Sequence, residues 1–171
     1  MRMTLSRKLR LACVMLLLAC TVGCDQTSKH IARVGLSQAG SVTLPRGLGE
    51  LRLAENPGSF MSLGALLPEP ARLTVFTLSV GVGLLVLFVY LTSRTQICVV
   101  RFVGLSLVMA GGLSNLLDRI LRHGLVTDFA TIRIGPFQTG IFNAADVLIM
   151  IGVSLIICTV QMKTRPTGRM Q

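Results

Sequence analysis

Residues 141–160 read IFNAADVLIMIGVSLIICTV, an apolar run long enough for a membrane-spanning helix. One carboxylate, Asp146, interrupts this run near its start, and a second, Asp128, lies shortly before it. An ionisable group at membrane depth is costly unless a partner or water supports it, so Asp146 is a candidate functional residue. Two aspartates brought together can share a proton and activate water, which is the chemistry of an aspartic protease.

The composition of the whole chain agrees with a membrane protein. Of its 171 residues, 51% are hydrophobic and only 14% are charged, and the mean hydropathy is +0.70. This is too apolar for an ordinary soluble domain, and the length predicts one domain, residues 1–171. The net charge of +10 does not indicate nucleic-acid binding, because the basic residues flank apolar runs and form no single patch with interleaved aromatic residues.

Four apolar segments predict a mainly α-helical bundle of four transmembrane helices, since each is near the length that crosses a bilayer. Glycines within the second and third segments are expected to let helices approach closely. Two longer polar segments, residues 25–72 and 118–140, contain short alternating runs next to proline and glycine. These runs predict a small β-sheet and loop subdomain outside the cytoplasm: a sheet of two or three strands in the first segment, and a strand and turn in the second. The expected spans are residues 9–24, 73–91, 97–117 and 141–162.

Lysine and arginine near the span ends predict the orientation. The positive-inside rule places both termini and the short loop between the second and third spans in the cytoplasm. All seven acidic residues fall outside these cytoplasmic segments, which agrees with that orientation. The basic residues that set it are Arg2, Arg7, Lys8, Arg10, Arg94, Lys163, Arg165 and Arg169.

Cysteine and histidine give no sign of a disulfide framework or a metal centre. The count of five cysteines is odd, no Cys-x-x-Cys pair occurs, and His30 and His123 lie far apart. A catalytic cysteine is also disfavoured, because the polar motifs place no histidine beside a cysteine. We therefore expect no metal and no cofactor.

The N-terminal region also fits a different hypothesis. Arg7-Lys8, an apolar core and Leu17-Leu18-Ala19-Cys20 together look like a secretory signal that ends in a lipoprotein cleavage box. Cleavage there would remove the first span and leave Cys20 lipidated. The further spans and the polar cluster that begins at Asp25 favour a first span that is retained.

Two short motifs occur in the first outer segment. Asp25 and Lys29 are four residues apart, so on a helix they share a face and can form a salt bridge that supports the helix end. Asn56-Pro57-Gly58-Ser59 is a turn signal, in which Gly58 is expected to support the backbone. Two interpretations of this turn stay open: a plain loop, or a loop whose Asn56 amide holds a substrate peptide.

The third span ends in Gly111-Gly112-x-x-Asn115-x-x-Asp118-Arg119. The last three named residues are three and four positions apart, so they share one helix face suited to lining a polar cavity. We expect Asn115 and Arg119 to face the substrate or support the two aspartates, and Asp118 to be structural.

The fourth span begins with a polar pair, Asn143 and Asp146, which are three residues apart and project from one face of a helix. Asp146 lies about 7 Å along the helix from Ile141, a depth that suits a peptide bond at the membrane boundary. An alternative is that Asp146 is only a buried partner for Arg119.

Taken together, these stretches resemble the lipoprotein signal peptidase family, also called signal peptidase II. The matching residues occur in the family's order over nearly the whole chain. The resemblance implies an aspartic endopeptidase of the bacterial inner membrane that cuts diacylglyceryl-modified prolipoproteins just before the lipidated cysteine. It implies that Asp128 and Asp146 are catalytic, that Asn56, Asn115, Arg119 and Asn143 line the substrate site, and that Asp25 and Lys29 support the structure. The stretches are Asp25-Gln26-x-Ser28-Lys29, Asn56-x-Gly58-Ser59, Gly111 through Arg119, Val126-x-Asp128-Phe129 and Phe142-Asn143-x-Ala145-Asp146.

This chain departs from the family's usual pattern at three places. The aromatic residue after the turn is shifted in Ser59-Phe60-Met61-Ser62, Ser114 stands where glycine usually precedes the asparagine, and Thr127 stands where valine usually precedes the aspartate. These differences bear on the shape of the pocket. Both expected catalytic acids are present.

A hypothesis from another class is a non-catalytic membrane scaffold or a small transporter with an Asp–Arg polar core. Cleavage of a lipidated precursor distinguishes the enzyme from both. For the enzyme, the expected partners are the prolipoproteins and membrane lipids, with no nucleic acid, and the expected state is a monomer.

Overall fold

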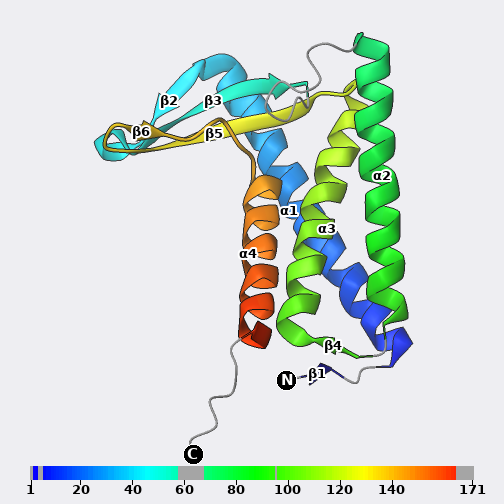
Figure 1. Ribbon diagram of the computed structural model, residues 1–171. Helices are drawn as coiled ribbons and strands as arrows, with labels where there is room; N and C mark the ends of the chain where they lie inside the picture. Colours follow the sequence, from blue (N-terminus) through cyan, green and yellow to red (C-terminus); the bar gives the residue numbers. More distant parts are fainter. Residues whose placement is uncertain (1, 4–5, 58–67, 95, 165–171) are drawn as a thin grey trace, which may run out of the picture.

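The computed structural model describes residues 2–3, 6–57, 68–94 and 96–164. Within these residues, four helices are long and apolar enough to cross a membrane. Figure 1 shows them side by side, and α3 packs against each of the other three. The predicted four-helix membrane bundle is therefore confirmed. The helices are α1 (Arg7–Ala39), α2 (Glu69–Ser93), α3 (Val99–Leu121) and α4 (Ala144–Thr164).

Helix α1 is much longer than the predicted span of residues 9–24. It continues through Asp25 and Lys29 and ends only at Ala39, where the backbone N–H of Gly40 caps it. The expectation that a loop begins after the first span was wrong. The physical reason is that buried side chains keep a helical spacing of three and four residues beyond the apolar run. These side chains are Asp25, Lys29, Ala32 and Leu36.

The two polar outer segments join in one antiparallel sheet. Its strand order is β2 (Ser41–Thr43), β3 (Gly49–Asn56), β5 (Val126–Ile134) and β6 (Phe137–Gln138). Within the described residues the sheet has four strands: the first segment supplies β2 and β3, and β3 pairs with β5 of the second segment, a pairing that the sequence patterns did not predict. It projects sideways from the end of the bundle where α4 begins (Figure 1).

A second, two-stranded sheet lies at the opposite end of the bundle, and the sequence patterns did not predict it. Strand β1 (Arg2–Met3) pairs with β4 (Ile97–Cys98), just before α3. For this reason α3 begins at Val99 and not at Ile97. Helix α1 begins and α4 ends at this same end of the molecule (Figure 1).

Glycines bring α3 and α4 into close contact. A Cβ atom at Gly111 would lie 2.5 Å from the carbonyl oxygen of Ala145, and one at Gly104 would lie 2.8 Å from that of Gly152. Such distances are too short for a side chain, so the expected role of small residues holds for this pair of helices. It does not hold for Gly83 in α2, which has open space around it.

Candidate active site

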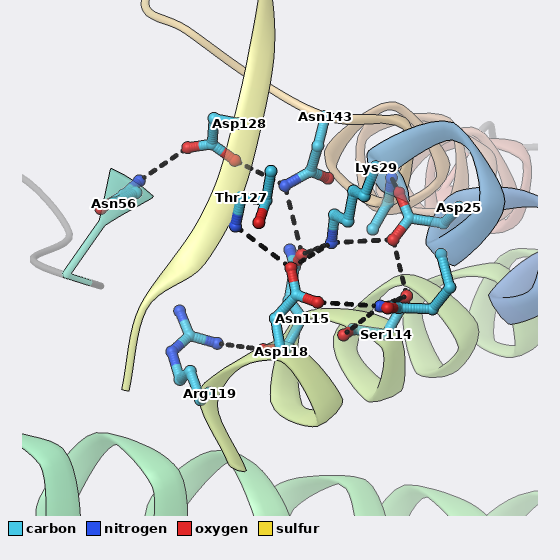
Figure 2. Close-up of polar contacts among 12 residues, drawn as sticks. Asp25, Lys29, Asn56, Ser114, Asn115, Asp118, Arg119, Thr127, Asp128 and Asn143 are labelled. Carbon is cyan, nitrogen blue, oxygen red and sulfur yellow. Dashed lines mark hydrogen bonds and ion pairs between the residues drawn. The ribbon is translucent and has the colours of Figure 1, made fainter. Parts of the chain in front are cut away.

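Polar side chains gather where α1, α3 and the start of α4 meet strand β5. Figure 2 shows them within one connected set of hydrogen bonds and ion pairs. Helices α1 and α3 supply residues that the sequence places about 90 positions apart, and the start of α4, β3 and β5 supply the rest. The predicted site residues in this cluster are Asp25, Lys29, Asn56, Asn115, Asp118, Arg119, Asp128, Asn143 and Asp146.

The start of α4 holds Asp146 through reciprocal contacts with Asn143. The Asn143 side-chain oxygen accepts the backbone N–H of Asp146 at 3.0 Å, and Asp146 Oδ2 accepts the backbone N–H of Asn143 at 3.1 Å. This is the arrangement of a capping box, which satisfies N–H groups that a helix end leaves free. Asp146 is therefore fixed by the first turn of its own helix.

Asn115 of α3 connects Asp146 to the rest of the cluster. Its Nδ2 donates to Asp146 Oδ1 at 3.0 Å, and its Oδ1 accepts from Asn143 Nδ2 at 3.2 Å and from Lys29 Nζ at 2.9 Å. These three hydrogen bonds of the Asn115 side chain all lie within the site.

Asp128 lies on β5 and is 3% exposed. Its Oδ1 accepts from Asn143 Nδ2 at 2.6 Å, and its Oδ2 accepts from Asn56 Nδ2 at 3.0 Å. Burial raises the pKa of the Asp128 carboxyl, and the nearby charge of Asp146 raises it further, although the two amides oppose this by stabilising the carboxylate. Asn143 thus contacts both carboxylates: its side-chain amide donates to Asp128, and its backbone N–H donates to Asp146.

Lys29 is fully buried and anchors a second group of contacts. Its Nζ lies 2.8 Å from Asp25 Oδ2 and 3.0 Å from Asp118 Oδ2, in addition to the bond to Asn115. The three donors of the ammonium group thus have three partners. The Asp25–Lys29 salt bridge lies inside α1, and not at the helix end where it was expected.

The two aspartates beside Lys29 also receive neutral donors from α1, α3, α4 and β5. Asp25 accepts the Ser114 hydroxyl at 2.6 Å and the backbone N–H of Ala145 at 2.7 Å. Asp118 accepts the Gln26 amide at 3.0 Å and the backbone N–H of Thr127 at 3.1 Å. These contacts tie α1 to α3 and to the first turn of α4, and they tie α3 to β5.

Three of these contributors were not among the predicted site residues. Gln26 lay within a matching motif, whereas Ser114 and Thr127 were noted only as departures from the family pattern. Both departures have hydrogen-bond partners: Ser114 donates to Asp25, and the Thr127 hydroxyl accepts from Arg33 Nη1 at 3.0 Å. The motif spacing could have indicated Gln26, but only the fold places the other two.

Arg119 does not hold Asp146 as a buried ion partner. Its Nη1 donates to the backbone oxygen of Asn115 at 3.3 Å, and its Nε is buried without a hydrogen-bond partner in the described part of the chain. Among the described residues, the ion pairs of this cluster are those of Lys29. The alternative in which Asp146 serves only to pair with Arg119 is therefore wrong.

One predicted supporting residue, Gly58, and the shifted aromatic at 59–61 lie outside the described residues. Asn56, at the end of β3, is described and contacts Asp128.

The hydrogen-bond partners of Asp128 and Asp146 indicate which reaction this site can support. Two carboxylates, Asp128 and Asp146, both accept hydrogen bonds from Asn143, at the end of apolar helices. Such a pair can share a proton and activate a water molecule for attack on a carbonyl carbon.

Comparison with known proteins identifies the family. The family model described as signal peptidase (SPase) II matches residues 17–162. A lipoprotein signal peptidase of Anaplasma marginale is 33% identical over 78% of this chain and 75% of its own length. One of Sphingopyxis alaskensis is 35% identical over 78% of this chain and 76% of its own length.

Solved structures agree with the sequence comparison. Two structures described as a bacterial membrane enzyme superimpose with TM-scores of 0.75 and 0.77, at 26% and 27% identity. They cover 94% and 90% of this chain, and 94% and 95% of their own chains. With its four apolar helices, the chain is thus a multi-pass membrane protein and a protease, and it belongs to the signal peptidase II family.

Proposed function

We propose that this protein is an aspartic endopeptidase that removes the signal peptide from diacylglyceryl-modified prolipoproteins by cutting before the lipidated cysteine. Asp128 and Asp146 are its catalytic pair. The observation that carries this proposal is that Asn143 bonds to both carboxylates, one from the sheet and one from α4. Family membership supports the substrate class and does not favour the scaffold or transporter alternative.

The reaction needs no metal and no covalent intermediate. One aspartate, ionised, takes a proton from a water molecule lodged between the pair, while the other, protonated, donates to the oxygen of the scissile carbonyl. The roles reverse as the amine leaves. Asn56, Asn115, Arg119 and Asn143 line the place where the peptide lies, and the unpartnered Nε of Arg119 is available to a substrate carbonyl.

The membrane position follows from the charge pattern and the position of the site. Both termini and the connection between α2 and α3 lie in the cytoplasm of a bacterial cell, and the protein is in the inner membrane. The carboxylates then lie near the outer leaflet, where the sheet meets the bundle (Figure 1). The lipid chains of the substrate enter from the side and stay in the bilayer, and one copy of the chain suffices.

The test is cleavage of a purified precursor in detergent or bilayers. The wild-type chain should cut a diacylglyceryl-modified precursor before its cysteine and leave the unlipidated form intact. Asp128→Asn and Asp146→Asn should each abolish cleavage while the protein stays folded. Glu55→Gln, which changes an exposed carboxylate on β3, is a matched control and should keep full activity.

Two results would contradict the proposal. Normal turnover by either aspartate variant excludes the pair as catalytic. Equal cleavage of lipidated and unlipidated precursors excludes the assigned substrate class.

A further inference from the structure

Two donors, Lys29 and Asn143, set the orientation of the Asn115 amide. An ammonium group donates three hydrogen bonds and accepts none. Since Lys29 Nζ lies 2.9 Å from this amide, the Asn115 oxygen must face it, and the amide nitrogen must face Asp146. The reversed amide would set its N–H groups against the ammonium and its oxygen against a carboxylate. Lys29 thus acts on Asp146 indirectly, by holding the Asn115 amide with its N–H group toward this carboxylate.

At Asp146, both carboxylate oxygens accept hydrogen bonds from N–H donors. The Asn115 amide donates to one oxygen and the Asn143 backbone N–H donates to the other. The residue also lies in the first turn of α4, where the helix dipole stabilises negative charge. Asp146 is half-buried, which leaves it partly open to water.

Asp128 differs in its surroundings. It lies on a strand, away from any helix start, and it is 3% exposed. Both of its donors are side-chain amides, from Asn56 and Asn143, and burial raises its pKa in spite of them. A pair that holds one proton therefore has two unequal sites for it.

The charged groups around Asp146 come from all the elements packed on it. Arg119 and Asp118 belong to α3, and Asp128 belongs to β5; Arg119 interacts with all three carboxylates. Lys29 and Asp25 belong to α1 and pair with each other, and Lys29 also acts on Asp128. The cations stabilise one negative charge on the Asp128–Asp146 pair, whereas the neighbouring carboxylates disfavour a second negative charge on it.

We propose that the proton of the resting pair resides on Asp128 and the charge on Asp146, and that Lys29 is a positioning residue that imposes this asymmetry through Asn115. This inference rests on the proposed function and assigns the two roles within it. Asp146 is then the general base, and Asp128 is the general acid.

In the first step, the oxygen of water bonds to the carbonyl carbon and the water proton passes to Asp146. The Asp128 proton passes to the carbonyl oxygen, which gives a neutral diol. The C–N bond then breaks: the leaving amine takes the proton from Asp146, and one hydroxyl proton returns to Asp128. The enzyme ends with the proton where it began.

Infrared spectroscopy tests the location of the proton without turnover. The chain has four aspartates and three glutamates, so the carbonyl band of a protonated carboxyl can be assigned by substitution. At neutral pH the band should be present in the wild type and absent in Asp128→Asn; in Asp146→Asn it should persist but, as the pH rises, disappear at a lower pH than in the wild type, because the charge that raises the Asp128 pKa is gone. A band that is retained in Asp128→Asn, or absent from the wild type, would overturn the assignment.

A second experiment tests the role of Lys29. Lys29→Met alone leaves two buried aspartates without their cation, so we combine it with Asp25→Asn and Asp118→Asn to give a neutral, similarly shaped cluster. With lipidated precursor, the acid limb of kcat/KM should move to higher pH by about one unit, and kcat should fall about tenfold. The alkaline limb should stay in place. Asn115→Ala should cause the same shift by removing the donor itself.

A purely structural role for Lys29 predicts a different result. The neutral variant would then show a smaller folded fraction but an unchanged pH profile per folded molecule, which would overturn the proposal, as would an unchanged profile in Asn115→Ala. The proposed function fails separately, if the wild type does not cleave the lipidated precursor.

Discussion

Two pairs of aspartates lie in one buried cluster, and they differ in what separates them. Asp25 and Asp118 share the ammonium group of Lys29, whereas Asp128 and Asp146 share Asn143, which is neutral. Three of the four carboxylates are 3% exposed or less, so burial alone does not distinguish the pairs. The ammonium group of Lys29 forms an ion pair with each of its two carboxylates, whereas two carboxylates that share a neutral amide can titrate as a unit. The shared partner, and not the depth of burial, therefore distinguishes a supporting pair of carboxylates from a pair that can transfer protons.

The largest expected effect would separate the two pairs by turnover. Asp128→Asn should lower kcat by a factor on the order of 10³ or more, since it removes an acid–base group. Asp118→Asn should instead lower the free energy of unfolding by about 1–3 kcal/mol, because its new amide nitrogen would face the donors of Gln26 or Thr127. Kinetics and thermal unfolding of both variants check this. A folded Asp118→Asn protein as inactive as Asp128→Asn would break the comparison.

The second prediction concerns the cation itself. Lys29→Met should lower the free energy of unfolding by about 3–5 kcal/mol, because two buried carboxylates lose their partner. Lys8→Met, which removes an exposed lysine of the same helix, is the control and should change stability little. Unfolding in detergent measures both. Equal stabilities would mean that Lys29 does not hold the supporting pair together.

The third prediction tests how helix contact aligns both pairs. Gly111→Ala would place a Cβ atom 2.5 Å from the Ala145 carbonyl oxygen, so α4 must shift at the turn that carries Asp146. We expect a loss of about 1–3 kcal/mol from overpacking and a lower kcat. Gly83→Ala has nothing within 4 Å and should be neutral or stabilising, by about 0.5–1 kcal/mol. Similar kcat values for the two variants would show that the contact does not position Asp146.

The fourth prediction is a pH effect on the catalytic pair. The pKa of Asp128 is raised by burial, so the folded protein favours its protonated form. That contribution to stability is full below the unfolded pKa of about 3.9 and is lost as pH rises through the folded value. The pH dependence of kcat/KM has the same sign: kcat/KM falls as pH rises, because Asp128 loses its proton. Asn56→Ala removes a donor that favours the carboxylate, so the alkaline limb should move up by about one pH unit. A limb that moves down would contradict this sign.

The smallest expected effect is at Thr127, where the family usually has valine. Its backbone N–H holds Asp118, while its hydroxyl accepts from Arg33. Thr127→Val keeps the first contact and removes the second, so stability should fall by about 1 kcal/mol and the pH profile should not change. Thermal unfolding and a pH–rate profile check both points. A shifted profile would mean that this position acts on the catalytic pair and not only on its support.

Local patterns predicted much of the fold and the candidates for the site. Of the short alternating runs in the two outer segments, Ser41–Leu44 overlaps β2, Glu50–Leu53 falls in β3, and Thr131–Ile134 falls in β5. What these patterns missed was non-local: the extension of α1 to Ala39, the pairing of β3 with β5, and the small sheet of β1 and β4. Each depends on contacts between segments far apart, which no window of sequence contains.

The amino-acid sequence by itself determined that four apolar stretches cross a membrane, since hydropathy is a property of each stretch alone. Only the tertiary structure decided which of four aspartates share a cation and which share an amide. It did so by packing α3 on α4 at Gly111 and by placing Lys29 against Asn115. The reason is physical: the charge state of a buried carboxylate depends on the atoms within a few ångströms of it, and the fold chooses those atoms.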